Sequence, residues 1–68
     1  MKFNERNFML ALADSGMLLK DVAKGAGISV NALYDIRKGN SQPRMSTLGR
    51  IAKALNISVK DLIQEEGE

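Results

Sequence analysis

Apolar residues recur along this chain at intervals of three and four positions, the spacing that places side chains on one face of an α-helix. Residues 45–55 show it most clearly, because their apolar positions follow the order i, i+3, i+6, i+7 and i+10. β-branched residues do not alternate with polar ones, so strands are not predicted. The pattern predicts a compact all-α fold of five short helices, at residues 4–15, 19–26, 30–38, 45–55 and 59–64.

Residues at the predicted boundaries favour these limits. Asn4 and Ser29 carry side-chain oxygens of the kind that cap the first turn of a helix. Ser58 and Asp61 have the spacing of a capping box ahead of the fifth helix. The residues predicted to end helices in the left-handed conformation are Gly16, Gly39 and Asn56.

The second and third helices are both short and are joined by only about three residues. Two helices connected so tightly cross at a steep angle, as in a helix-turn-helix. Such a crossing needs a small residue where the backbones approach, which Ala23 provides, and a residue that accepts positive φ, which Gly27 provides. Gly25 has no comparable role in this pattern beyond a local approach of the backbone.

The amino-acid composition excludes several classes of function. The 68 residues are predicted to form one domain, residues 1–68, and they include no cysteine and no histidine. Disulfides, thiolate metal sites and the commonest general base are therefore missing. We predict no enzyme activity, no catalytic residues, no metal, no cofactor and no small-molecule ligand. The apolar run FMLALA at residues 8–13 is too short to span a bilayer, and a cytoplasmic protein without a membrane partner is expected.

The charge is unevenly distributed along the chain. The net charge is only +2, but the stretch from Lys20 to Lys60 contains eight cations and two anions, whereas the residues outside it contain two cations and six anions. A basic middle favours an anionic partner, with nucleic acid first. A solvated surface with scattered charges is the alternative.

The segment that begins AKGAGIS at residue 23 resembles the phage repressor and Cro type of helix-turn-helix domain, the lambda-repressor-like or XRE group of bacterial and phage regulators. The matching residues are Ala23, Gly27, Ile28, Ser29, Leu33, Ile36, Gly39, Pro43, Thr47, Leu48, Ile51, Ala52, Lys53, Ala54, Leu55, Ser58 and Leu62. The resemblance covers roughly residues 8–63. It implies sequence-specific binding of double-stranded DNA by a transcriptional regulator, expected to be a repressor, whose recognition helix 30–38 enters the major groove. It also implies a homodimer on a two-fold symmetric operator.

The resemblance also places the DNA contacts. The expected base-contacting residues are Ser29, Val30, Asn31, Tyr34 and Asp35. The expected contacts to the DNA backbone are Lys20, Lys38, Asn40, Ser41, Gln42 and Arg44. Alternatives stay open for three of them: Asn31 as an ordinary exposed residue, Tyr34 as a cover for the helix junction, and Asp35 as an ion-pair partner of Lys38. Of the two roles for Asp35, the sequence favours the ion pair with Lys38 over the base contact.

Two positions depart from similar domains. Leu18-Leu19 replace the usual Ser-Gln at the start of the second helix, where the amide approaches a phosphate. An arginine on the first helix often pairs with a glutamate late in the third, but these positions read Leu12 and Arg37. The sequence therefore predicts that this ion pair is lost from both sides.

The first helix is more apolar than the fold requires. Met9, Leu10 and Ala13 occupy positions that are commonly polar in similar domains, and Leu18-Leu19 likewise replace polar residues. Either these residues thicken a thin core, which the sequence favours, or they form an exposed patch for a partner or a second copy. The patch supports an alternative function as a helical protein-interaction or antitoxin-type module.

Overall fold

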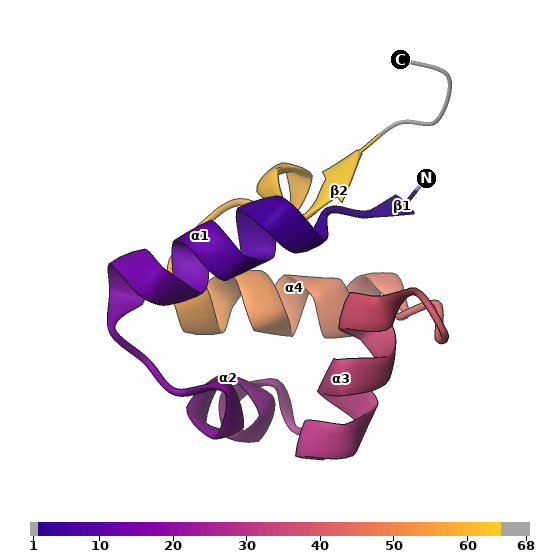
Figure 1. Ribbon diagram of the computed structural model, residues 1–68, viewed down its shortest axis with the longest axis horizontal. Coiled ribbons are helices and arrows are strands. Elements are labelled where there is room, and N and C mark those ends of the chain that lie inside the picture. Colours follow the sequence, from indigo (N-terminus) through magenta and orange to yellow (C-terminus); the bar gives the residue numbers. More distant parts are fainter. Residues whose placement is uncertain (1, 65–68) are drawn as a thin grey trace.

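The computed structural model describes residues 2–64, which form four α-helices, one 3₁₀ turn and a two-stranded antiparallel sheet (Figure 1). In chain order the elements are β1 (Lys2–Phe3), α1 (Glu5–Ser15), α2 (Leu19–Ala26), α3 (Val30–Lys38), α4 (Met45–Leu55), η1 (Val59–Asp61) and β2 (Ile63–Gln64). The first four helices have the predicted bounds, apart from Asn4, which caps α1 from outside.

The predicted fifth helix at residues 59–64 is wrong. The capping contacts of Ser58 and Asp61 are present, since the Asp61 carboxylate accepts from the Ser58 N–H at 3.3 Å. They cap only the short turn η1, because the next residues pair with the start of the chain. The Asn4 N–H donates to the Leu62 carbonyl at 2.6 Å, and Phe3 pairs with Ile63. This distant pairing takes the backbone groups that a helix would have used. Apart from it, the described chain is all-α.

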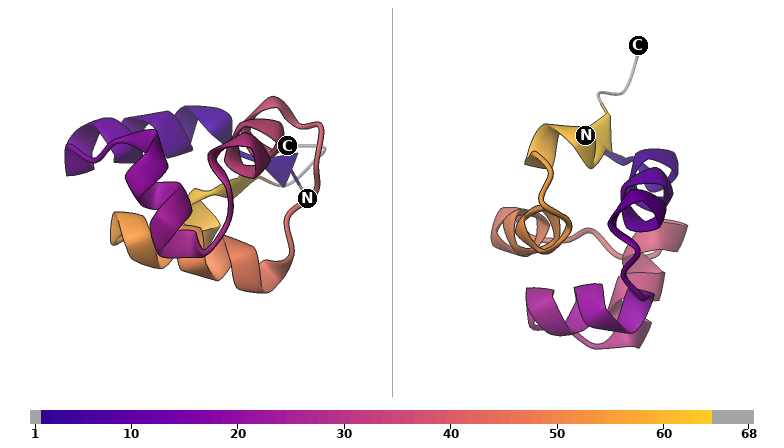
Figure 2. Two further views of the ribbon diagram at one scale, coloured as in Figure 1. Left: turned by 90° about the horizontal axis from the view of Figure 1, so that it is seen from below. Right: turned by 90° about the vertical axis from the view of Figure 1, so that its left-hand side faces the viewer.

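The four helices enclose one small core. Figure 2 shows α2 and α3 on the same side of the α1–α4 pair, with α2 packed against α4. The largest fully buried side chains come from every helix and from the segment after η1: Phe8, Val22, Leu33, Leu48, Ile51 and Leu62. Each contributes about 1.5–3 kcal/mol through burial. Phe3 covers the core from β1, with its ring centroid 5.6 Å from that of Phe8.

Gly25 lies on α2 where this helix packs against α4. Among the glycines of the described chain, it is the one with the least room for a side chain. A Cβ added to Gly25 would stand 3.2 Å from the Cβ of Ala54, tighter than ordinary van der Waals contact. Neither atom can turn away, because each Cβ is fixed to its backbone. The glycine therefore permits the approach of α2 to α4, and the structure identifies Ala54 as the partner that the sequence pattern did not reveal.

Candidate nucleic-acid interface

A tight turn joins α2 to α3 and orients the candidate recognition helix. Gly27 ends α2 with φ of +73°, as predicted, and Ala23 beneath the turn is 1% exposed. The Ile28 N–H donates to the Ala23 carbonyl at 3.0 Å, which closes the end of α2. The Ser29 hydroxyl then accepts from the Ala32 N–H at 3.0 Å and begins α3. The helix-turn-helix is thus held by backbone and capping hydrogen bonds on both sides of the turn.

The exposed face of α3 contains most of the expected base-contacting residues. Leu33 and Ile36 point into the core, so the opposite side of the helix is left open. The side chains exposed on or beside that face are Ser29, Asn31, Tyr34, Asp35 and Lys38. Val30 differs from them: it is half-buried and packs against the core cluster. It therefore presents less surface than the sequence pattern predicted.

The predicted ion pair between Asp35 and Lys38 is wrong. Within residues 2–64 a single ion pair is formed, and neither residue takes part in it. Lys38 instead extends along Tyr34, with its ammonium nitrogen 6.0 Å from the ring centroid. The Arg37 guanidinium approaches the same ring, at 5.4 Å. Tyr34 is 42% exposed, so an aromatic ring flanked by two cations lies at the surface of α3.

The end of α3 and the loop after it hold most of the expected backbone-contacting residues. They are all exposed: Lys38, Asn40, Ser41, Gln42 and Arg44. Lys20 is also exposed, in the first turn of α2. At the start of α4, Arg44 makes no side-chain cap, and the first turn contains no acidic residue. The free N–H groups of that turn and its positive dipole end therefore stand beside a basic loop, an arrangement suited to phosphate.

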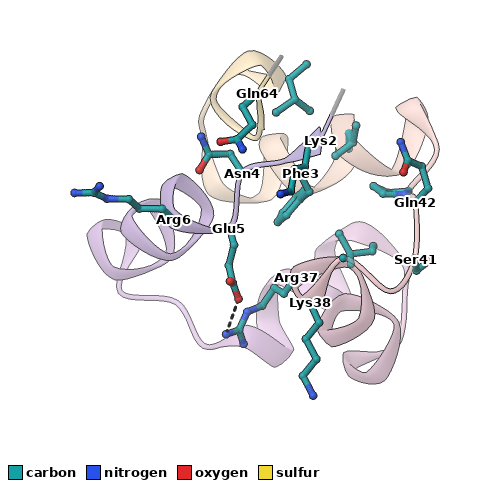
Figure 3. Close-up of a pocket in the computed structure, with 15 residues that line it drawn as sticks. Lys2, Phe3, Asn4, Glu5, Arg6, Arg37, Lys38, Ser41, Gln42 and Gln64 are labelled. Atoms are coloured by element: carbon teal, nitrogen blue, oxygen red, sulfur yellow. Dashed lines mark ion pairs between the residues drawn. The ribbon is translucent and has the colours of Figure 1, made fainter. Parts of the chain in front are cut away.

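An open cleft separates this loop from the start of the chain. It is lined by the end of α3, the loop at Ser41–Gln42, the first turn of α1 and the β1–β2 pair (Figure 3). Arg37 and Glu5 meet across it, with Nη2 3.3 Å from Oε2. The sequence did not predict this ion pair, because similar domains place the partner on the first helix at the position of Leu12 and not in the first turn. The signal available was an acidic residue in the first turn of α1.

The surface of α1 corrects another expectation. Leu10 is 55% exposed and Met9 40% exposed, and Ala13 is exposed as well. At the start of α2, Leu18 is 59% exposed. These four residues do not thicken the core, as the sequence favoured, because Phe8 and its neighbours already fill the inner face of α1. Leu19, in contrast, is half-buried and packs against the core, as expected. Met9, Leu10 and Ala13 form an apolar patch on the outside of α1.

Comparisons with known proteins agree with this geometry. The Cro/C1-type helix-turn-helix DNA-binding domain matches residues 10–66. The chain belongs to this family. It is also 39% identical over 51 residues to the HTH-type transcriptional regulator DdrOP3 of Deinococcus deserti. That match covers 75% of this chain but 40% of the relative, so the chain spans less than half the length of the curated protein that it matches.

The membership confirms the resemblance to phage repressor and Cro domains that the residues from Ala23 onward carry. The family is a class of DNA-binding domains and not a class of enzymes. Among residues 2–64, no helix is long and apolar enough to cross a membrane, and no three His, Cys, Asp or Glu side chains gather as metal ligands would.

Proposed function

We propose that this Cro/C1-type domain binds double-stranded DNA sequence-specifically, with α3 in the major groove, as part of a bacterial or phage transcriptional repressor. One observation carries the proposal: the exposed face of α3 combines polar side chains able to read bases with a basic loop directly after it. The major groove admits a single α-helix, whose first turns reach the base edges. The flanking cations then meet the phosphates on either side.

Base recognition is assigned to the N-terminal half of α3. The Asn31 amide offers a donor and an acceptor, which match the N6 and N7 edge of adenine. Asp35, which has no ion-pair partner within the described chain, can accept from N4 of cytosine. The half-buried Val30 presents a methyl group suited to thymine, while Ser29 and Tyr34 complete the surface.

Backbone binding is assigned to the loop and to the starts of α2 and α4. Lys20, Lys38 and Arg44 supply charge, and the side chains of Asn40, Ser41 and Gln42 supply hydrogen-bond donors. These contacts fix the register of α3 without reading sequence. Two copies of the domain on a two-fold symmetric operator would double this footprint and block access by polymerase.

Selection of bound sequences from random duplex DNA tests the proposal. The expected result is an enriched motif that the protein binds at least about 1,000-fold more tightly than unrelated DNA at the same salt concentration. A matched control is Lys53→Ala, which removes an exposed cation from the outer face of α4 and should leave the motif unchanged. Equal binding to selected and unrelated duplexes would contradict sequence-specific recognition.

A second function, binding of a protein through α1, is favoured by the exposed apolar patch of Met9, Leu10 and Ala13. Contiguous apolar patches on the surface of soluble domains mark sites of protein interaction when they are large.

A further inference from the structure

The outward face of α1 is centred on Leu10. This side chain is 55% exposed, on the side of the helix opposite the buried Phe8. The right-hand view of Figure 2 shows α1 at the edge of the molecule, with α4 and the C-terminal segment on one side and no described element on the other. Met9 and Ala13 extend the apolar surface beside Leu10.

Two opposite charges flank Leu10 at equal distances. Arg6 lies four residues before it and Asp14 four residues after it, so both share its face of the helix, each displaced by about 6 Å along the axis. Both side chains are exposed. Neither makes an ion pair with any other residue in the range 2–64. From the start of α1 to its end, this face therefore carries a positive charge, an apolar centre and a negative charge.

We propose that a second copy of this chain docks on α1, with the two helices antiparallel and the two-fold axis passing close to Leu10. The two-fold rotation reverses the order of the charges in the second copy. Arg6 of each copy therefore faces Asp14 of the other copy. The two leucines meet at the centre, where packed helices lie about 8–10 Å apart. A parallel arrangement would oppose like charges, which selects the antiparallel one.

The proposed interface is small. Stable interfaces bury about 800 Å² per partner, whereas α1 has only 11 residues, or about 16 Å of length, to offer. The dimer is therefore weak and dissociates on dilution. It deepens the second candidate function, protein binding through α1, by naming the partner. It does not depend on DNA binding, because every measurement below is made without DNA.

Sedimentation equilibrium of the protein between about 10 μM and 1 mM, at low salt, is the first test. The average mass should rise with concentration from monomer towards dimer. Leu10→Glu should remain monomeric throughout. Leu18→Glu is the matched control, because it places the same charge at an equally exposed leucine outside α1 and should self-associate like the parent. A parent protein that stays monomeric at 1 mM, or a Leu10→Glu protein that associates like the parent, would overturn the proposal.

Charge exchange tests the antiparallel register. Arg6→Asp and Asp14→Arg should each weaken self-association at least 10-fold, because each opposes like charges across the two-fold axis. The double variant should recover it, and an equimolar mixture of the two single variants should form heterodimers. Both changes suit the dipole of α1, since an acid enters its first turn and a base its last, so folding should survive. Failure of both the double variant and the mixture to associate would exclude this pairing.

Discussion

Glu5 and Arg37 connect the first turn of α1 to the last turn of α3 through an ion pair of 3.3 Å. Similar domains often make this connection with a base on the first helix and an acid on the third. Here the acid is on α1 and the base on α3, and the α1 partner is Glu5 in the first turn of the helix, not the residue at the position of Leu12. Because the Arg37 guanidinium also lies 5.4 Å from the Tyr34 ring, the pair links α1 to the exposed face of α3.

A double-mutant cycle measures this connection. With Glu5→Gln and Arg37→Gln, the coupling free energy should be about 0.2–1 kcal/mol, since the Glu5 side chain is 49% exposed and solvent screens the pair. The coupling should shrink in about 1 M salt. Arg37→Gln alone should cost more than Glu5→Gln, because the arginine stem is largely buried. Strictly additive effects in chemical denaturation would show that the pair contributes nothing.

Gly27 should resist substitution for a conformational reason. Its φ of +73° is unfavourable for any residue with a Cβ, while the nearest atom to an added Cβ is an Arg50 nitrogen at an ordinary 3.6 Å. Gly27→Ala should therefore lower the free energy of unfolding by about 1–2 kcal/mol. Gly49 lies inside α4 with open space around it, so Gly49→Ala should instead raise stability by about 0.5–1 kcal/mol. Equal changes in the free energy of unfolding at the two sites would show that the positive φ of Gly27 does not limit substitution.

Gly25 should resist substitution for a steric reason. Although alanine is a better helix former, a Cβ there stands 3.2 Å from the Cβ of Ala54. Gly25→Ala should therefore fail to give the stabilisation of about 1 kcal/mol expected from helix propensity. Combining it with Ala54→Gly should relieve the contact, and thermal melting of the four proteins gives the coupling. A Gly25→Ala protein that is as stabilised as Gly49→Ala would show that α2 and α4 can separate freely.

Arg44 should control non-specific affinity for DNA. Its removal takes away one proposed phosphate contact, so Arg44→Ala should weaken binding to all duplexes and reduce the slope of log affinity against log salt by about one. Lys53→Ala, on the outer face of α4, is the control and should leave the slope as it is. An unchanged slope for Arg44→Ala would mean that the loop lies away from the DNA backbone.

Asn31 should control specificity. Asn31→Ala is expected to cost about 1–3 kcal/mol on the preferred site and to relax the preference at one base pair. Binding to unrelated DNA should change little, because no charge is lost. Motifs selected by the two proteins at one fixed salt concentration provide the comparison. Identical motifs with equal discrimination at every position would exclude Asn31 as a reader of bases.

Local signals made much of this fold predictable. Helix boundaries depend on residues a few positions apart, so the caps at Asn4 and Ser29 and the left-handed residues Gly27 and Asn56 could be recognised directly. The apolar stripes then identified which side of each helix is buried. Leu33 and Ile36 on α3 are examples, and they also defined the exposed face that the candidate interface uses.

Contacts between distant parts of the chain were not predictable in the same way. Residues 59–64 satisfy the local rules for a helix, but pairing of Ile63 with Phe3 overrides them. The Glu5–Arg37 pair and the approach of Gly25 to Ala54 likewise depend on how whole helices pack. The exposure of Leu10 could not be inferred either, since its apolar character alone fits a buried or an outward position.

The β1–β2 pair has a mechanical consequence. Lys2 lies opposite Gln64 and Phe3 opposite Ile63, so the two strands end side by side at one corner of the molecule (Figure 1). Tension applied between residues 2 and 64 would load these few hydrogen bonds one after another, as in the opening of a zip, and not all together. The β1–β2 pair would separate at low force while α2 and α4 remained packed. Stretching would thus uncover Phe3 and the end of the core before it disturbed the helix-turn-helix.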